Sequence, residues 1–201
     1  MKSFQLSDMP QNALVWRRDV QQAKDILGLV IPPGYEAVIY HAGDYLGPFR
    51  QGDALSLPAQ GRLFRRRAAM EGQVYFCRRQ LDRPLYWGLG SLPAPGGDVF
   101  GASGQLRLSL DNAMVLVREV AAGQERLDDA GLGRRLESLV VGHLRPALIE
   151  AVGQMGLGKA RGGLTLLARR LEEALKPQLT EMGLGCTALL VENLIINKET
   201  L

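Results

Sequence analysis

The stretch that decides the fold reads GQVYFCRRQLDRPLYWGLGSLPAPGGDVFGASGQLRLSLDN, from Gly72 to Asn112. It contains runs in which apolar and polar residues largely alternate, as a half-buried sheet requires. These runs are Gln73 to Arg79, Pro84 to Leu89 and Gln105 to Leu110. The segment from Pro93 to Gly97 holds two prolines and two glycines and breaks the chain, so we expect the last run to return as a separate strand.

The chain before this stretch also has strand patterns. Ala13 to Arg17 (ALVWR) predicts a short strand with Trp16 as its buried anchor, and Asp19 to Leu27 predicts one or two helical turns. Leu27 to Tyr40 (LGLVIPPGYEAVIY) predicts two strands around a Pro-Pro-Gly turn, hence a hairpin or a sharp corner.

The next segments are rich in turn residues. His41 to Pro58 contains Gly43, Gly47, Pro48 and Gly52, which separate short pieces such as Ala54 to Leu57. Gly61 to Met70 fits either a helical turn or a loop.

After Leu110 the apolar residues recur at helical spacing. Asp111 is placed to cap a helix from Asn112 to Ala122, and another helix begins near Leu132. The apolar stripe of the second helix contains Leu136, Leu139, Val140, His143, Ala147 and Leu148. Pro146 interrupts this pattern, so we expect a kink or break between Gly142 and Pro146.

His143 has two interpretations. On an apolar stripe it is a candidate switch that titrates near neutral pH. A lone histidine with no partner identifiable in the sequence is more often a hydrogen-bonded core residue, and we favour that interpretation.

The last helix extends from Gly162 to Met182. Its apolar stripe consists of Leu164, Leu167, Leu171, Ala174, Leu175, Leu179 and Met182. Pro177 is expected to bend it, and Gly183 and Gly185 end it. Cys186 to Asn197 (CTALLVENLIIN) then predicts a final strand.

The segment Gly153 to Ala160 (GQMGLGKA) nearly matches the loop G-x-x-x-x-G-K-[ST] that binds phosphates. Ala160 has no hydroxyl for Mg²⁺, and helical spacing precedes the segment where the motif requires a strand. We therefore interpret it as a glycine-rich connection between two helices.

Composition predicts a folded cytoplasmic protein. The 201 residues are 46% hydrophobic and 22% charged, and no apolar run approaches the roughly 20 residues that span a bilayer. Residues 1–10 lack the apolar region of a signal peptide. We expect no metal site and no cofactor, because Cys77 and Cys186 lack a second Cys or a His at ligand spacing, and both fit small core residues.

Positive charge concentrates in the first half of the chain. Residues 1–90 carry 12 Lys and Arg against 8 Asp and Glu, whereas residues 91–201 carry 12 against 13. The candidate contact for an anionic surface consists of Arg62, Arg65, Arg66, Arg67, Arg78 and Arg79, with Glu71 as the local acidic neighbour. The alternative is a solvated loop followed by outward-facing strand residues.

The order of these features resembles the SPFH, or band 7, domain of stomatins, prohibitins and flotillins, and its bacterial virion core protein-like branch. The resemblance rests on ALVWR, LVIPPGYEAVIY, QVYFCRRQLDRPLYWGLG, GQLRLSLDNAMVLVREV and LEEALKPQLTEMGLGCTALLVENLIIN. It implies one α+β domain over residues 1–201, with a curved antiparallel sheet from residues 1–110 packed against amphipathic helices from 111–183 and a final strand at 184–197.

The resemblance also implies a function without catalytic residues. Members scaffold other proteins at membranes and assemble laterally, so we expect protein partners at the inner face of the cytoplasmic membrane, anionic lipid as a candidate ligand, and a homo-oligomer. The given sequence has no N-terminal membrane anchor, extended coiled coil or Cys-rich zinc-binding tail, which favours association through partner proteins. The alternative is a soluble basic module that binds nucleic acid or an acidic protein. An enzyme is not expected, since no Ser/His/Asp or Cys/His arrangement is recognisable.

Overall fold

The computed structural model describes residues 13–22, 26, 29–41, 43–53, 69–81 and 84–197. The protein is α+β, with antiparallel sheets and helices. Its contacts divide the chain into two compact units, Met1–Gln80 with Leu110–Ala130, and Leu81–Ser109 with Gly131–Leu201. We call them the five-stranded unit and the three-stranded unit, after the sheet that each contains among the described residues. The expectation of one domain over residues 1–201 stays a prediction.

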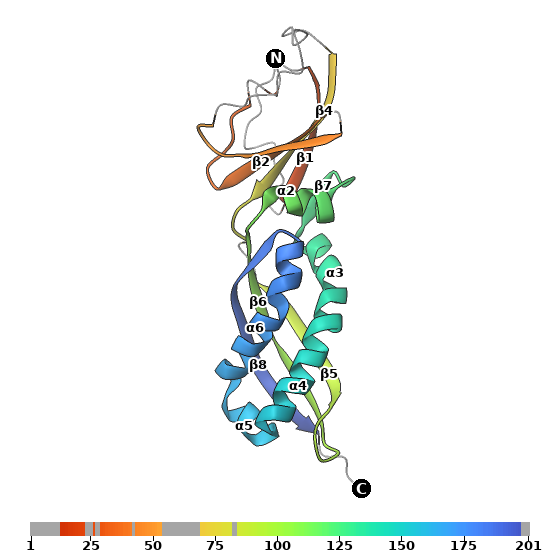
Figure 1. Ribbon diagram of the computed structural model, residues 1–201, viewed down its shortest axis with the longest axis vertical. Coiled ribbons are helices and arrows are strands. Elements are labelled where there is room, and N and C mark those ends of the chain that lie inside the picture. The colour runs from red at the N-terminus through yellow and green to blue at the C-terminus, as the bar shows by residue number, and fades with distance from the viewer. Residues whose placement is uncertain are drawn as a thin grey trace. The chain divides into compact units, whose positions relative to one another are not determined.

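The sheet of the five-stranded unit is antiparallel and has the order β3-β2-β4-β1-β7 (Figure 1). Its strands are β1 (Ala13–Gln22), β2 (Tyr35–His41), β3 (Asp44–Phe49), β4 (Ala69–Arg78) and β7 (Arg126–Asp128). The central strand β4 places Phe76 opposite Trp16 and Gln73 opposite Tyr40. The strands predicted at 13–17 and 73–79 are confirmed.

One face of this sheet carries an apolar core. The core consists of Val20, Ile26, Ile31, Ala37, Ile39, Val74 and Phe76. Trp16 is only partly buried and packs at the margin of this core, with its ring centre 6.0 Å from that of Phe76. The prediction of Trp16 as the buried anchor is wrong, because Trp16 stays partly buried whereas Phe76, its partner in the register on β4, is fully buried.

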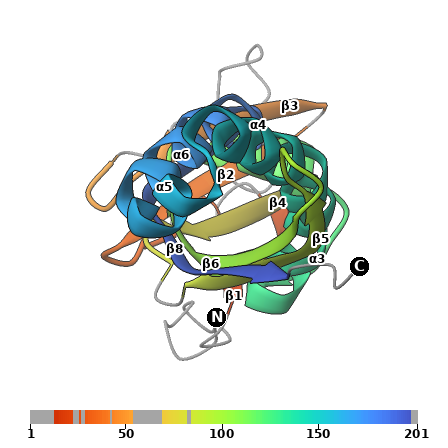
Figure 2. The same ribbon diagram turned by 90° about the horizontal axis from the view of Figure 1, so that it is seen from below.

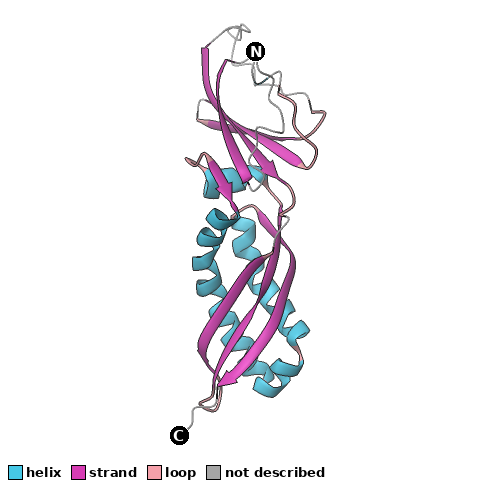
Figure 3. Ribbon diagram, turned by 180° about the vertical axis from the view of Figure 1, so that it is seen from behind, coloured by secondary structure: helices cyan, strands magenta, loops and turns pink. Residues whose placement is uncertain are grey.

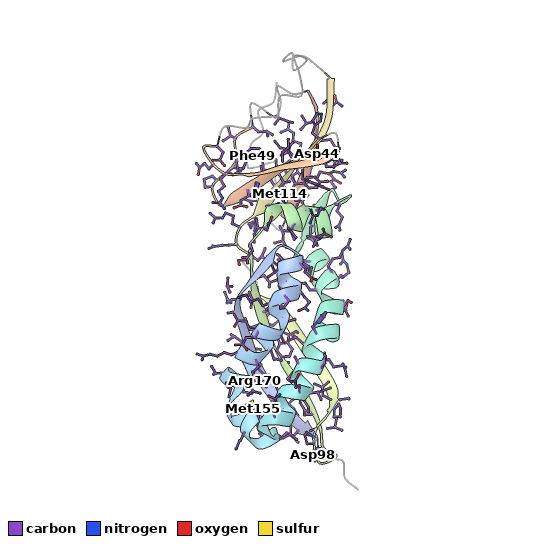
Figure 4. All side chains as sticks on the ribbon, in the orientation of Figure 1. Asp44, Phe49, Asp98, Met114, Met155 and Arg170 are labelled. Carbon is purple, nitrogen blue, oxygen red and sulfur yellow. The ribbon has the colours of Figure 1, made fainter. Side chains whose placement is uncertain are left out.

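The opposite face packs against a short helical segment. Val15, Val38, Tyr75 and Cys77 lie on this face, since successive residues of a strand alternate, and all are buried. The segment comprises α2 (Ala113–Leu116) and the π-helical η3 (Val117–Ala121), and α2 contacts β2 and β3. Figure 4 labels Met114 of α2 together with Asp44 and Phe49, the two ends of β3.

The cap of α2 is Asn112 and not Asp111, so that prediction is wrong by one residue. Asn112 has an extended backbone, and its Oδ1 accepts the backbone N–H groups of Met114 at 3.1 Å and Val115 at 3.2 Å. Both residue types cap helices well. Asn112 directly precedes Ala113, the first residue of the helix, so its side chain is the one placed to reach the free N–H groups of the first turn.

The three-stranded sheet has the order β5-β6-β8. β5 (Leu85–Pro93) and β6 (Val99–Leu110) form an antiparallel hairpin, closed by the Ala94 N–H donating to the Asp98 carbonyl at 2.8 Å. The final strand β8 (Leu184–Asn197) runs along the other side of β6. The predicted strands and the chain break are confirmed. The strands form two sheets rather than the single curved sheet expected, because β5 and β6 pair with β8 and not with β4.

Helices cover one face of this sheet. They are α3 (Asp129–Leu139), the π-helical η4 (Val140–Leu144), α4 (Arg145–Met155), α5 (Leu157–Gly162) and α6 (Leu164–Glu181). Figure 2 shows α4 and α6 on one side of the β5-β6-β8 sheet, and Figure 3 shows the strands in front of the helices from the other side. α6 contacts β8, and α4 contacts β5.

The predicted stripe of the last helix is confirmed. Leu167, Leu171, Leu175 and Leu179 of α6 are all buried. The helix ends at Glu181 with Met182 as its C-cap, and Gly183 follows with a φ of +73° that glycine adopts without strain. The predicted final strand is also confirmed, and Gly185 already lies within it.

The break expected between Gly142 and Pro146 is confirmed and takes the form of η4. Pro146 lies in the first turn of α4, where its missing N–H costs no hydrogen bond. A π-helical turn changes the angular spacing of the side chains on either side of it. His143 is consequently exposed while Leu144 is fully buried, so the interpretation of His143 as a core residue is wrong.

The glycine-rich segment Gly153 to Ala160 connects two helices, as predicted. α4 ends at Met155 and α5 begins at Leu157. Gly156 between them has a φ of +78°. A phosphate loop would need a strand before it, and none is present here.

Two expectations for the early chain are wrong in part. Residues 19–22 belong to β1 and not to a helical turn, because the pairing with β4 continues as far as Gln22 opposite Ala69. Residues 29–32 form no strand, so there is no hairpin before Tyr35, and β2 pairs with β3 and β4 instead. The alternative of a sharp corner is confirmed, since the Tyr35 N–H donates to the Pro32 carbonyl at 3.2 Å and Gly34 has a φ of +79°. Pro32 and Pro33 have no N–H to donate to a ladder. Residues 23–25 and 27–28 lie outside the described residues.

The turn-rich segment contains a strand that the sequence did not predict. β3 includes Gly47 and Pro48, and it lies at the edge of its sheet, where proline is tolerated. Ala54 to Leu57 and residues 61–68 lie outside the described residues, whereas Ala69 and Met70 begin β4 and form neither a helical turn nor a loop.

The closest approach within the three-stranded sheet occurs at Gly104. A Cβ at this position would overlap the Leu190 carbonyl of β8 and would lie 2.9 Å from Cζ2 of Trp87. Trp87 is 6% exposed. The aromatic ring therefore packs over a glycine of the middle strand, as expected for a tryptophan beside an open backbone.

We predict that Gly104→Ala lowers the free energy of unfolding by about 2 kcal/mol or more, since the added methyl must displace backbone atoms of β8. Urea denaturation measures the change. The matched control is Gly88→Ala in β5, where the nearest atom to the new Cβ is the Ser103 Cβ at 3.9 Å. Equal stability of the two variants would contradict the prediction.

Candidate functional site

The predicted arginine cluster is described only at its second part. Arg62, Arg65, Arg66 and Arg67 lie outside the described residues. Arg78 ends β4 and Arg79 follows it. Both are held by residues of or near β2, which the sequence analysis did not consider.

Arg78 is fixed across the pair of strands β2 and β4. Tyr35 is its partner in the register, and Arg78 Nε donates to the Tyr35 hydroxyl at 3.1 Å. The guanidinium carbon lies 5.7 Å from the centre of the Tyr35 ring, within the range of a cation–π interaction. Arg78 is therefore ordered by an aromatic partner and is not simply a solvated charge.

Glu36 is a buried carboxylate that two arginines approach. Its side chain is 5% exposed, and Oε1 accepts from Arg50 Nε at 2.9 Å. Arg79 Nε lies 3.6 Å from the same oxygen. The expectation that Glu71 is the acidic neighbour of the cluster is therefore incomplete, because strand pairing brings Glu36 to Arg79 from a distant part of the sequence.

Glu36, Arg50 and Arg79 form one group, whereas Arg78 pairs with Tyr35, whose side chain lies on the face of β2 opposite that of Glu36. Asp53 adds a negative charge beside this group, since its carboxylate accepts the Arg50 backbone N–H at 2.6 Å. The side chains of Arg50 and Arg79 remain 61% and 54% exposed. Each guanidinium has five N–H donors in a plane, so those not directed at Glu36 are available to an external anion.

Both cysteines are thiols at neutral pH. Burial, followed by the charge of Glu36, raises the pKa of Cys77 far above its usual range. Burial and the nearby Glu172 carboxylate raise the pKa of Cys186 to about 11, although a hydrogen bond with the Ala188 backbone opposes the rise. Cys77 is fully buried, as predicted, whereas Cys186 is only partly buried. Neither environment favours the thiolate that nucleophilic chemistry requires.

A polar hollow of about 540 Å³ opens on the five-stranded sheet. Arg17, Asp19, Tyr40 and Gln73 line it from three adjacent strands. Arg17 Nε and Asp19 Oδ1 are 3.5 Å apart, and the Tyr75 hydroxyl donates to Gln73 at 2.7 Å. Arg17 and Asp19 neutralise each other, so this pair gives the hollow no excess charge.

A second hollow, of about 430 Å³, lies on the uncovered face of the three-stranded sheet. Gly88, Gly90, Gly101, Ser103, Asn193 and Ile195 are among the residues that line it. Neither hollow was predicted from the sequence. The alternation of residues along each strand assigns these side chains to a face, but their assembly depends on strand partners that are distant in the sequence.

The described residues hold no group of three or more His, Cys, Asp or Glu side chains placed to bind a metal ion. No helix among them is both long and apolar enough to cross a membrane. No family model matches the chain, and no curated protein matches it. The family resemblance therefore rests on the residues quoted for it.

We predict that Glu36→Gln lowers the free energy of unfolding by about 2 kcal/mol, because it removes a charge-assisted hydrogen bond and leaves two arginines side by side. The matched control is Glu119→Gln, which breaks an exposed ion pair of 2.7 Å with Arg118 and should cost less than about 1 kcal/mol. Urea denaturation of both variants gives the comparison. An effect at Glu36 no larger than that at Glu119 would show that the buried carboxylate does not stabilise the unit.

The thiols give a prediction for pH dependence. Because the raised pKa keeps Cys186 protonated, its rate of alkylation by iodoacetamide should rise about tenfold per pH unit up to a pH near 11. Cys77 should react only when the protein unfolds. A rate for Cys186 that levels off near the usual cysteine pKa of about 8.5 contradicts the raised value.

Proposed function

We propose that the protein is a non-enzymatic scaffold or adaptor of the SPFH/band 7 type, located at the inner face of the cytoplasmic membrane directly or through partner proteins. The order of the motifs from ALVWR to the closing helix and strand supports this assignment. The α+β class, with antiparallel sheets and helices, agrees with the class that the resemblance implies.

The observation that carries the membrane part of the proposal is the geometry of Arg50 and Arg79 at Glu36. A buried carboxylate orients both side chains, yet more than half of each remains exposed. An arginine near an anionic membrane surface contributes about 1 kcal/mol to binding, and a phosphate or carboxylate of a headgroup accepts from the guanidinium plane. Arg62, Arg65, Arg66 and Arg67 belong to the same proposed contact.

The edges of the three-stranded sheet support the scaffold part. In the described part of the chain, β5 and β8 are the outermost strands, and β8 is 14 residues long. An outer strand has a row of backbone N–H and C=O groups that pair with another chain. A scaffold needs such surfaces for protein partners.

We predict that the purified protein sediments with vesicles that contain phosphatidylserine at low salt and is released as salt rises, because exposed charges are screened. Arg50→Gln should weaken binding about fivefold, the equivalent of about 1 kcal/mol. The combined Gln substitution of Arg62, Arg65, Arg66 and Arg67 should weaken it more than tenfold.

The matched control is Arg134→Gln, which removes the same charge from an exposed position of α3. The proposal is contradicted if the Arg50 variant and the combined variant bind vesicles as well as wild type does. It is also contradicted if wild type is not retained on anionic vesicles and no membrane partner co-purifies with it. Strong, salt-dependent binding of single-stranded oligonucleotides without vesicle binding would favour the alternative of a soluble nucleic-acid-binding module.

A further inference from the structure

The uncovered face of the three-stranded sheet has an unusual set of side chains. Two rows cross the strands, one of Tyr86, Gln105 and Glu192 and the next of Gly88, Ser103 and Asn193. Each row contains a hydrogen bond, from Gln105 to Glu192 at 2.7 Å and from Asn193 to Ser103 at 3.4 Å. The hollow of about 430 Å³ is lined by Gly88, Ser103 and Asn193 of the second row and by Gly90, Gly101 and Ile195.

The fold explains Gly90 but not Gly88, because Gly90 lies where the register of β5 and β6 shifts between Leu89 and Leu92, next to Ser91 with its φ of +53°. Gly88 and Gly90 have no positive φ, unlike Gly104 neither is crowded, and a Cβ at Gly90 would meet nothing within 4 Å. A Cβ at Gly88 would meet only Ser103 Cβ at 3.9 Å, an ordinary contact. Glycine weakens a strand, and an unforced glycine often marks a place where another backbone or a ligand comes close.

Large apolar side chains border the hollow. Tyr86 is 77% exposed and Ile195 is 62% exposed. Of the five large hydrophobic side chains that are exposed in the described residues, three belong to the outer strands β5 and β8. Apolar side chains that gather on one exposed face indicate a contact surface.

We propose that this face binds a second copy of the chain about a twofold axis, with Tyr86 of each copy seated in the glycine hollow of the other. A projecting ring and a hollow on the same face are self-complementary, as a twofold interface requires. Along β5, the ring of Tyr86 and the hollow between Gly88 and Gly90 are about three residues, or about 10 Å, apart. A twofold axis that exchanges them between copies therefore passes midway, about 5 Å from the ring and about 5 Å from the hollow.

Charge and size are consistent with this partner. Among the residues that the structure describes, the exposed charges of this face are Arg107 and Glu192, so two copies meet without a surplus of like charge. The 9 residues of β5 and the three strands give a face of about 30 Å by about 14 Å, or about 400 Å² per copy. A total of about 800 Å² belongs to weak interfaces, and we expect dissociation constants in the micromolar range or above.

The inference rests on the proposed scaffold function, because it names the partner as a second copy. The test is sedimentation equilibrium of the full chain from about 1 μM to about 1 mM. Wild type should rise from the monomer mass of 22.0 kDa towards twice that mass. Tyr86→Ser removes the ring and Gly88→Thr fills the hollow, and each should weaken dimerisation at least tenfold.

A mixture of the two variants gives a sharper result. Tyr86→Ser keeps the hollow and Gly88→Thr keeps the ring, so the mixed pair retains one of the two contacts and should dimerise more strongly than either variant alone. Gly88→Thr should also leave thermal stability unchanged or higher, since threonine favours strands. The control is Gly133→Ala in α3, where the new Cβ meets nothing within 4 Å, and this variant should dimerise as wild type does.

The inference is overturned if wild type is a monomer at every concentration. It is also overturned if Tyr86→Ser and Gly88→Thr both dimerise as strongly as wild type, which would place the contact elsewhere, for example along the strand edges. Vesicle sedimentation of the same variants separates this inference from the proposed function. If the protein is retained on anionic vesicles but does not dimerise, only the inference of a dimer interface is rejected. Dimerisation through Tyr86 without any membrane or partner binding removes only the membrane function.

Discussion

The three-stranded sheet depends on a contact at which its middle strand has no side chain. At Gly104 the carbonyl of Leu190 takes the space that a Cβ would need, and the ring of Trp87 packs beside it. This approach holds β5, β6 and β8 together on the side that the helices cover, where Phe100, Leu106 and Leu108 of β6 are buried. The opposite side has small residues for a different reason. Gly90 lies at the irregularity of β5, whereas Gly88 is in register and uncrowded, so in our proposal its absent side chain leaves room for a second copy.

The five-stranded unit depends on electrostatics as well as on packing. Its core is apolar, yet Glu36 is a carboxylate with a side chain only 5% exposed. Removing a charge from water is costly unless partners replace the water, and Arg50 and Arg79 serve as those partners. For function, the consequence is that Glu36 fixes the positions of the two arginine side chains. Contact with Glu36 restricts the rotamers of these arginines while their side chains stay exposed. Ordered guanidinium groups bind anions with a smaller loss of conformational entropy.

Periodicity predicted the elements well because it depends on neighbours in the sequence. The alternation in Gln105 to Leu110 and the stripe through Leu167, Leu171 and Leu175 correspond to the strand and helix observed. Partners were not predictable in the same way. Nothing local distinguishes Asn112 from Asp111 as a cap, and the π-helical turn before Arg145 moves His143 out of the core by a change in winding. The salt bridge of Glu36 and the hollow at Gly88 exist only after distant strands pair. The sequence therefore predicted Arg79 as a contact residue but neither Arg50 nor their shared partner Glu36.

Both proposals place function on surfaces: a basic group that meets anions, and an uncovered sheet face that meets another copy. The most direct measurement for the second surface is the concentration dependence of backbone amide chemical shifts by NMR. We predict gradual shifts at Tyr86, Gly88, Ser103 and Asn193 as concentration rises, with constant shifts throughout the five-stranded unit. Constant shifts on the β5-β6-β8 face, or shifts confined to the five-stranded unit, would contradict the assignment of this face as a contact surface.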